Sequence, residues 1–235
     1  MAPLVSQLSD TKFESWQKHG LAIGEYPFRN SISRDLSHTR KLCSDAGEWK
    51  NLKSIFHPGA YMFTTWTGKT PHLDFIAASK RGMDNGAFVL HRTHGLTTDI
   101  NAAATRAVTK MKATITQRFM IDGCEVDAEA DCRFCYFWSK DPGTGRWGAN
   151  CIRHWYEKDK LIPVDPRKVP HLDDEKLKGY PAGYRYLAYC QEETMEVKVK
   201  LDMPGHIRDK NKNGEMHDAL YLQAKAWVEG DDVQF

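Results

Sequence analysis

Two segments of alternating polar and apolar residues, joined by a two-residue turn, constrain the fold of this chain more than any other feature. From Lys110 to Phe119 the even positions are polar and the odd positions mostly apolar, with Gln117 as the exception. After Asp122-Gly123, which is a strong hairpin signal, the polar set moves to the odd positions of residues 125–133. The pattern predicts a long antiparallel hairpin with one charged face and one apolar face.

The turn also predicts the register of this hairpin. It pairs residues whose numbers sum to about 245, which sets Arg118 opposite Asp127 and lets unlike charges pair on one face. We expect the charged face to meet solvent or another subunit, and the face of Met111, Cys132 and Phe134 to line the interior. A third strand, over about residues 146–156, completes a curved meander.

The segments before the meander have helical patterns with one strand among them. We expect helices over residues 32–44, 48–56 and 70–80, and a strand over 60–66. Thr70-Pro71 is a good N-cap followed by a proline at the first helical position. This order is typical of an α+β cone-shaped barrel, in which a curved antiparallel sheet wraps round helices.

The length of 235 residues fits one large domain with an appendage. We expect an N-terminal arm over residues 1–29, the cone over 30–165 and a helical C-terminal extension over 166–235. Helical spacing near residues 183–189 and 215–229 suggests that the extension packs on the cone or on a partner subunit, where it could close a pocket as a lid.

Composition excludes several function classes. The net charge is +2 and basic residues are interleaved with acidic ones, so we expect no nucleic-acid partner. No apolar run approaches the ~18 residues of a membrane span, and the N-terminus lacks a signal peptide pattern. We expect a cytoplasmic protein with no membrane contact, assembled as a homodimer or homotrimer.

Cysteine and histidine spacings do not favour a metal site. The six cysteines are expected to be reduced, and Cys132 and Cys135 have CxxC spacing but would face opposite ways on a strand. His91 and His94 would likewise be separated on a strand unless it is bulged. With no Gly-rich phosphate loop in addition, we expect neither a metal nor another cofactor.

Several stretches resemble a known family. Residues 48–58, the strand around His91, the paired long strands and residues 145–156 resemble the SnoaL-like, scytalone dehydratase-like group of the nuclear-transport-factor-2-like superfamily. The resemblance covers about residues 30–165. It implies the cone fold and a pocket enzyme.

The resemblance also implies catalytic residues. The family has an aspartate between its first helices and a histidine on a strand, which match Asp45 and His91, with His94 as the competing alignment. The histidine would take a proton from carbon or from a hydroxyl, while the carboxylate fixes its tautomer and stabilises the imidazolium.

Scytalone dehydratase has a polar set that this chain does not match. Its positions fall on Ser44, Thr64, Thr116, Cys132 and Phe134, which suggests a larger and more apolar ligand. The developing oxyanion would be stabilised by Tyr61, His94 or Arg153. The residues expected to line the substrate pocket are Tyr61, Phe63, Trp66, Cys132, Phe134, Tyr136, Asn150 and Arg153.

The sequence therefore predicts a cofactor-independent dehydratase, cyclase or isomerase for a hydrophobic polycyclic or polyketide-like molecule, in secondary metabolism. Two alternatives stay open: a non-catalytic binding or dimerisation module of the same fold, and a cofactor-free decarboxylase or oxygenase. His91 could instead be a core histidine bonded to backbone, and Asp45 an N-cap for the following helix.

Overall fold

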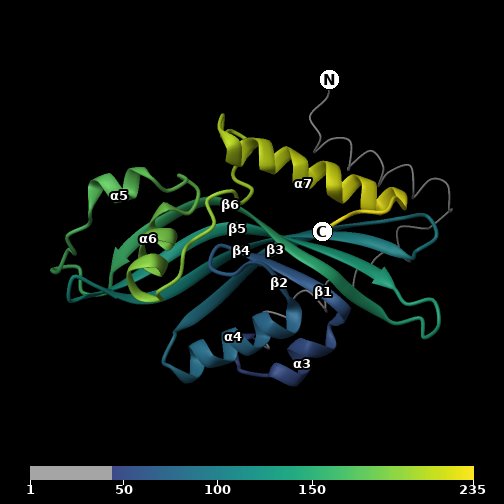
Figure 1. Ribbon diagram of the computed structural model, residues 1–235, viewed down its shortest axis with the longest axis horizontal. Helices are drawn as coiled ribbons and strands as arrows, with labels where there is room; N and C mark the ends of the chain where they lie inside the picture. The colour runs from purple at the N-terminus through teal and green to yellow at the C-terminus, as the bar shows by residue number, and fades with distance from the viewer. Residues whose placement is uncertain (1–43) are drawn as a thin grey trace.

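The structure is a computed structural model that describes residues 44–235 (Figure 1). The expected N-terminal arm and nearly all of the helix predicted over 32–44 lie outside the described residues. The described part is a six-stranded sheet with helices against both faces. No helix in it is long and apolar enough to cross a membrane.

The sheet is strongly curved and its strand order is β2-β1-β6-β5-β4-β3. Neighbouring strands are antiparallel except for β1 and β6, which are parallel, so the prediction of a wholly antiparallel sheet is wrong at this one pair. The strands are β1 (Phe56–Thr64), β2 (Gly68–Pro71), β3 (Val89–Ile100), β4 (Arg106–Ile121), β5 (Cys124–Lys140) and β6 (Trp147–Pro163).

The central hairpin has the predicted register. Arg118 lies opposite Asp127, and their side chains form an ion pair with 2.6 Å between Nε and Oδ1. Asp122 and Gly123 both adopt positive φ, of 48° and 68°, as a tight two-residue hairpin turn requires. The alternation read from the sequence therefore places side chains on the two faces as expected.

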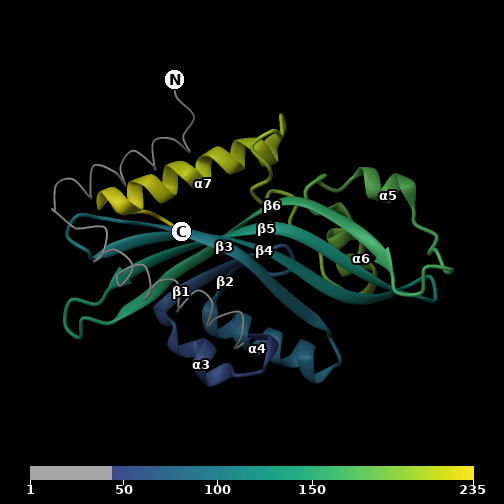
Figure 2. The same cartoon turned by 180° about the vertical axis from the view of Figure 1, so that it is seen from behind.

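Helices cover the two faces of the sheet separately (Figures 1 and 2). The first two lie below the sheet in Figure 1, and the last lies across its opposite face. The helices are α3 (Trp49–Ser54), α4 (His72–Asp84), α5 (Asp174–Lys178), α6 (Arg185–Thr194) and α7 (Lys212–Glu229). The curved sheet wrapped round helices confirms the predicted α+β cone.

One predicted helix start is wrong. Thr70 and Pro71 pair with Met62 and Tyr61 as part of β2, and α4 begins at His72 without a side-chain cap. The extended conformation of Pro71, with ψ of 139°, suits a strand as well as a helix entry, so the local cap signal did not distinguish the two.

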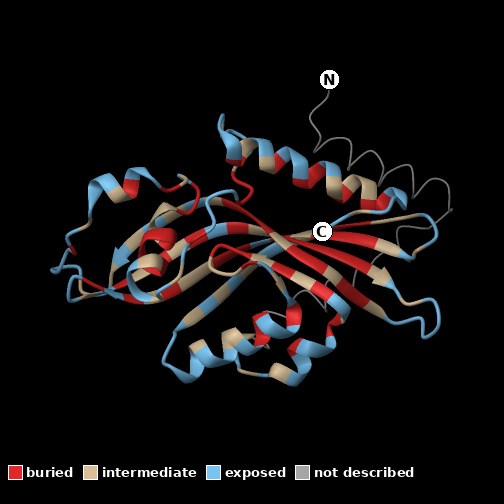
Figure 3. Ribbon diagram, viewed as in Figure 1, coloured by how far each residue is buried: buried red, intermediate tan, exposed pale blue. Residues whose placement is uncertain are grey.

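Two hydrophobic cores lie on opposite faces of the sheet. Figure 3 shows the buried residues along the strands and on the helices at both faces. The inner core joins the concave face to α3, α4 and α6 and contains Met111, Cys132 and Phe134, as expected. The outer core joins the other face to α7, where Trp227 packs near Phe137. The C-terminal helices thus contact both faces of the sheet.

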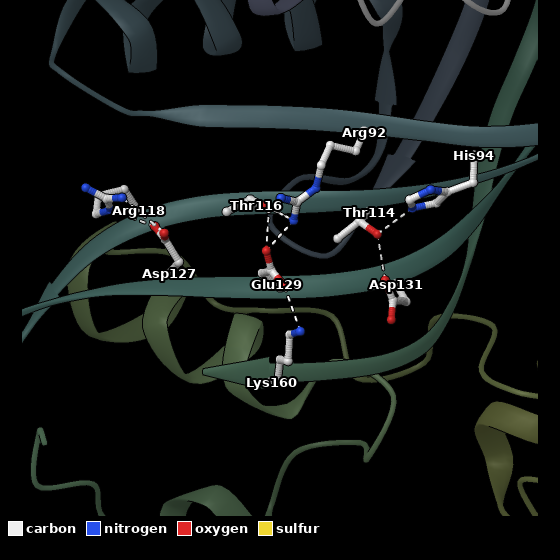
Figure 4. Close-up of polar contacts among 9 residues, drawn as sticks. All are labelled: Arg92, His94, Thr114, Thr116, Arg118, Asp127, Glu129, Asp131 and Lys160. Carbon is white, nitrogen blue, oxygen red and sulfur yellow. Dashed lines mark hydrogen bonds and ion pairs between the residues drawn. The ribbon is translucent and has the colours of Figure 1, made fainter. Parts of the chain in front are cut away.

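The charged face is only partly open. Figure 4 shows its exposed part, where Arg92, Thr116 and Lys160 contact Glu129. Elsewhere α7 covers this face, and Arg133 beneath it hydrogen-bonds to Tyr221. The expectation that the whole charged face meets solvent or a partner subunit is therefore wrong for the part under α7.

The described cysteines are all free thiols. Cys132 belongs to the inner core and Cys135 to the outer core, so the CxxC pair faces opposite ways as the strand spacing predicted. Burial raises the pKa of the Cys135 thiol to about 12. Cys43 lies outside the described residues.

Candidate active site

A bulge in β3 separates the two histidines of the HxxH pair. The pairing of β3 with β4 shifts between Thr93 and Gly95, so His94 is the extra residue. His91 lies opposite Ile115 and contributes to a cavity under the concave face. His94 is exposed on the opposite face, where its Nε2 lies 2.8 Å from the Thr114 hydroxyl (Figure 4).

Asp45 holds His91 through both of its carboxylate oxygens. The backbone N–H of His91 donates to Oδ2 at 2.7 Å, and its ring Nδ1–H donates to Oδ1 at 2.6 Å. The side chains are only 11% and 18% exposed for His91 and Asp45. Asp45 makes no cap to α3, whose N-cap residue Glu48 also lacks a side-chain cap bond.

This geometry selects one imidazole tautomer. A carboxylate on Nδ1 holds the proton there, so Nε2 on the far side of the ring is the nitrogen that can accept a proton. The same carboxylate stabilises the imidazolium formed by protonation. The Asp45–His91 pair is therefore arranged as a general base with its orienting carboxylate.

The cavity beside His91 has a volume of about 160 Å³ and is partly open to the surface. Its walls are mostly aromatic and aliphatic, and a cavity of roughly 150 Å³ is known to hold one benzene ring. A polycyclic ligand would extend through its mouth. The lining residues from α3, α4 and their flanks include Asp45, Trp49, Phe75 and Met83, and Trp66 comes from the turn between β1 and β2. The sheet, α6 and its C-cap residue supply Val89, His91, Ile115, Gln117, Phe134, His154, Tyr156, Leu187, Gln191 and Met195.

His154 and Tyr156 line the cavity from β6, and neither is in the set of site residues predicted from the sequence. The His154 ring packs edge-on against Phe134, with 4.1 Å between centroids, and its Nδ1 lies 2.7 Å from the Phe63 carbonyl oxygen. Burial raises the pKa of the Tyr156 hydroxyl, which is also hydrogen-bonded to Thr65. The sequence signal that could have identified them is their spacing, because His154 and Tyr156 are two residues apart on one strand and therefore point to the same face.

Gln117 and Gln191 place two buried amides in the cavity wall. The Thr65 hydroxyl donates to Gln191 Oε1 at 2.8 Å, and Gln191 Nε2 donates to Gln117 Oε1 at 3.4 Å. Gln117 stood out in the sequence as the polar exception on the apolar face of its strand, a signal that was noted but not assigned to the site. Gln191 comes from α6, beyond the region of family resemblance.

Four of the predicted site residues meet at this cavity: Asp45, His91, Trp66 and Phe134. His94 does not, because the bulge turns it to the outer face. His94 therefore does not share a cavity with His91.

Tyr61 and Phe63 were assigned to the wrong face of β1. Inward positions on this strand are Ala60, Met62 and Thr64, and Tyr61 and Phe63 alternate with them. Phe63 packs against both cores, but neither aromatic residue lines the cavity. Lys69 lies over the Tyr61 ring, 4.7 Å from its centroid.

Asn150 and Arg153 are also outside the cavity. Asn150 lies at a shift in the pairing of β5 with β6 and donates to the Ser139 hydroxyl at 2.7 Å. Arg153 lies under α7, where it donates to Gln223 at 2.6 Å. Burial lowers the pKa of its guanidinium. Arg153 therefore does not stabilise an oxyanion at His91.

Cys132 and Tyr136 face inward but do not reach the cavity. Cys132 is buried with its thiol 3.4 Å from the Ala113 carbonyl oxygen, and Tyr136 stacks on Trp138 with 5.3 Å between centroids. Both belong to the inner core and are not part of the cavity wall. Among residues 44–235, no three His, Cys, Asp or Glu side chains gather closely enough to hold a metal ion.

No model of a known protein family matches the chain. Curated fungal proteins are similar to it over most of their length. A PEP2-like protein of Fusarium vanettenii is 60% identical over 202 residues, which cover 86% of each chain. Pea pathogenicity protein 2 of the same fungus is 57% identical over 202 residues with the same coverage. An uncharacterised protein of Emericella nidulans is 59% identical over 204 residues, which cover 85% of this chain and 86% of its own.

Solved structures are similar at a much lower level. Hexachlorocyclohexane dehydrochlorinase LinA-type3 from Novosphingobium barchaimii matches 63% of this chain and 99% of its own, with 12% identity and a TM-score of 0.47. An NTF2-like protein of unknown function from Pseudomonas putida matches 61% of this chain and 94% of its own, with 12% identity and a TM-score of 0.43.

The fungal relatives share more than half of their aligned residues with this chain, whereas the dehydrochlorinase structure shares 12%. The family assignment therefore rests on the fungal relatives. The fold itself is described by the strand order and the helices on the concave face. The chain belongs to the family of pea pathogenicity protein 2 and its PEP2-like relatives.

Proposed function

We propose that the protein is a cofactor-independent acid/base enzyme, a dehydratase, cyclase or isomerase that acts on a hydrophobic small molecule with one or more rings. The observation that carries the proposal is the Asp45–His91 pair at the wall of an apolar cavity. A histidine oriented by a carboxylate needs no metal or redox group to move a proton.

The burial of the pair supports this role. A surface His–Asp contact would be screened by water, whereas these side chains are 11% and 18% exposed beside an aromatic wall. Trp66 and Phe134 provide a flat apolar surface for a ring. A ligand bound there would place its carbon or hydroxyl proton next to the imidazole, which is the orientation effect that such reactions require.

The chemistry begins when His91 Nε2 removes a proton from the ligand. In a dehydratase, the C–H electron pair forms the new double bond, and the hydroxyl on the neighbouring carbon leaves as water with a proton returned by the imidazolium. In an isomerase, the imidazolium returns the proton to a different carbon. Asp45 accepts the Nδ1–H hydrogen bond and keeps the ring in place throughout.

The experiment is solvent exchange of carbon-bound protons, because it detects proton abstraction before any product forms. Neutral aromatic and alicyclic ketones are incubated with the protein in D2O, and loss of the α-proton signal is followed by NMR. We expect His91→Gln to reduce the catalysed rate about 100-fold or more, and Asp45→Asn to reduce it clearly.

His94→Gln is the matched control, since it makes the same change on the same strand but on the outer face. It is expected to exchange at the wild-type rate. Equal rates for wild type and His91→Gln would refute the proposal and favour the binding module. If His94→Gln lowered the exchange rate as much as His91→Gln does, the loss in His91→Gln would reflect a general structural change and not the removal of a base.

A further inference from the structure

Three buried polar side chains are linked by hydrogen bonds, and the last of them places an amide N–H donor in the cavity wall. Thr65, Gln191 and Gln117 are 1%, 3% and 8% exposed. They are contributed by three separate parts of the chain: the segment after β1, helix α6 and strand β4.

In the structure this row of hydrogen bonds runs from Thr65 toward Gln117. The Thr65 hydroxyl donates to Gln191 Oε1, which turns the Gln191 NH2 group toward Gln117 Oε1. The Gln117 NH2 group is therefore the far end, and its acceptor in the structure is the Met195 sulfur at 3.6 Å. A thioether is a weak acceptor, and an NH2 group has two hydrogens to donate.

A buried donor with so weak an acceptor favours a ligand oxygen in its place. Leaving an amide donor poorly satisfied inside a protein costs about 1–3 kcal/mol, which a carbonyl oxygen in the cavity would recover. Gln117 and Met195 both line the cavity, so a bound molecule can reach the amide.

The register of β3 and β4 places this donor near the base. His91 lies opposite Ile115 and Val89 lies opposite Gln117, so His91 and Gln117 are diagonal neighbours on the concave face. Diagonal positions on paired strands are about 7–8 Å apart. That spacing leaves room for a carbonyl group and its neighbouring carbon between the imidazole and the amide.

The charges of the wall restrict the ligand further. The described residues that line the cavity include no lysine or arginine, and Asp45 is their one carboxylate. An anionic ligand would enter without a cation to pair with and close to a negative charge, which is unfavourable in an apolar site. The ligand class that fits is an uncharged ring compound with a carbonyl group.

We propose that Gln117 is the donor that binds the ligand's carbonyl oxygen and stabilises it as an enolate, and that Gln191 is a positioning residue that orients Gln117. The enolate part of this assignment rests on the proposed function. When His91 takes the proton from the carbon beside the carbonyl, the C–H electron pair forms a C=C bond and the carbonyl π pair moves to oxygen. The Gln117 N–H faces that oxygen.

This assignment gives the C-terminal extension a role in specificity. Gln191 and Met195 both lie on or next to α6, which packs on the concave face. The extension therefore contributes a polar group to the cavity wall, which would select a ligand with a carbonyl oxygen.

Binding of two isosteric probes tests the carbonyl site without any catalysis. Acetophenone and α-methylstyrene have the same shape, but only the first has a carbonyl oxygen. Their dissociation constants are measured by ligand-observed NMR titration, and the ratio of the acetophenone value to the α-methylstyrene value is compared among variants. The different water solubilities of the probes contribute equally to every variant and cancel.

We expect Gln117→Met to raise this ratio about 5-fold to 10-fold, which is the net worth of one neutral hydrogen bond. Gln191→Met should raise it by a smaller factor, because it removes only the orientation. Gln223→Met is the matched control on α7, on the outer face, and should leave the ratio unchanged.

Exchange of the acetophenone methyl protons in D2O separates the two proposals. At saturating acetophenone, Gln117→Met should lower the catalysed rate at least about 100-fold, the usual cost of removing one oxyanion donor. A raised ratio without any exchange in wild type would support the carbonyl site and refute the acid/base enzyme.

An unchanged ratio in both amide variants would overturn the inference. So would a wild-type protein that binds neither probe. If Gln117→Met does not fold, as shown by its thermal melt, the ratio in Gln191→Met decides the question alone.

Discussion

Asp159 is expected to make the stability of the protein fall as pH rises through about 6. Its Oδ2 accepts from the backbone N–H groups of Tyr186 and Leu187, at 2.6 and 2.9 Å, at the start of α6. Burial raises the pKa of this carboxyl from 3.8 to about 6, although the backbone donors oppose the shift. The folded protein therefore binds this proton more tightly than the unfolded chain does.

The sign of the effect follows from that difference. Between pH 3.8 and about 6 the folded state holds the proton and the unfolded chain has lost it, so stability declines as pH rises across this window. At about 1.4 kcal/mol for each pKa unit, the contribution lost between pH 4.5 and pH 8 is about 2 kcal/mol. Below the unfolded pKa of 3.8 the contribution is fully present.

Asp159→Asn isolates this term, because the amide oxygen can still accept from α6 but cannot ionise. Urea unfolding of wild type and variant is measured from about pH 4.5 to pH 8, and the difference between them removes the titration of all other groups. We expect the variant to gain about 2 kcal/mol relative to wild type across this range. A difference independent of pH would refute the reasoning.

Two further predictions concern packing. Gly183→Ala should destabilise the protein by about 1–3 kcal/mol in urea unfolding, because its Cβ would lie 2.2 Å from the Tyr156 carbonyl oxygen. Gly95→Ala is the control, since nothing lies within 4 Å of a Cβ added there. Equal losses of stability in the two variants would contradict the predicted clash. Trp227→Ala should lower the free energy of unfolding by about 3–5 kcal/mol, because it leaves a cavity in the outer core under α7. Leu222→Ala, at a site on α7 that is 53% exposed, should change it by less than about 0.5 kcal/mol. Comparable losses in the two variants would show that Trp227 does not hold α7 on the sheet.

The long hairpin was predictable because its information is local. The alternation on both sides of Asp122-Gly123 fixes which side chains share a face, and the turn length fixes the register. The alternation extends over many residues of both strands, so one exception such as Gln117 does not change the predicted faces. That exception was itself a sign of a polar group in the cavity wall.

The residues that line the cavity were harder to predict because the alternation of inward and outward positions changes at strand irregularities. On β6 the pairing shifts near Asn150, so the inward set becomes His154 and Tyr156, and Arg153 points outward. A bulge of this kind leaves no clear mark in the sequence of one chain. The choice of aromatic and polar residues by type alone therefore selected the wrong face.

Contacts between distant segments could not be derived from local patterns. The sequence gives no spacing rule that brings Gln191 beside Thr65, or α7 onto the outer face, because these depend on how the extension folds back. The pairing of Asp45 with His91 was expected through the family resemblance, and periodicity alone would not have suggested it. Its catalytic role stays a prediction.

The most direct test of the account is the state of the His91 ring, observed by ¹⁵N NMR of histidine-labelled protein at neutral pH. His91→Gln identifies its signals among the ten histidines. We predict that Nδ1 carries the proton and that the Nε2 signal shifts when acetophenone is added, with both features altered in Asp45→Asn. A proton on Nε2, or a ring that does not respond to the ligand, would contradict the assignment of His91 as the base.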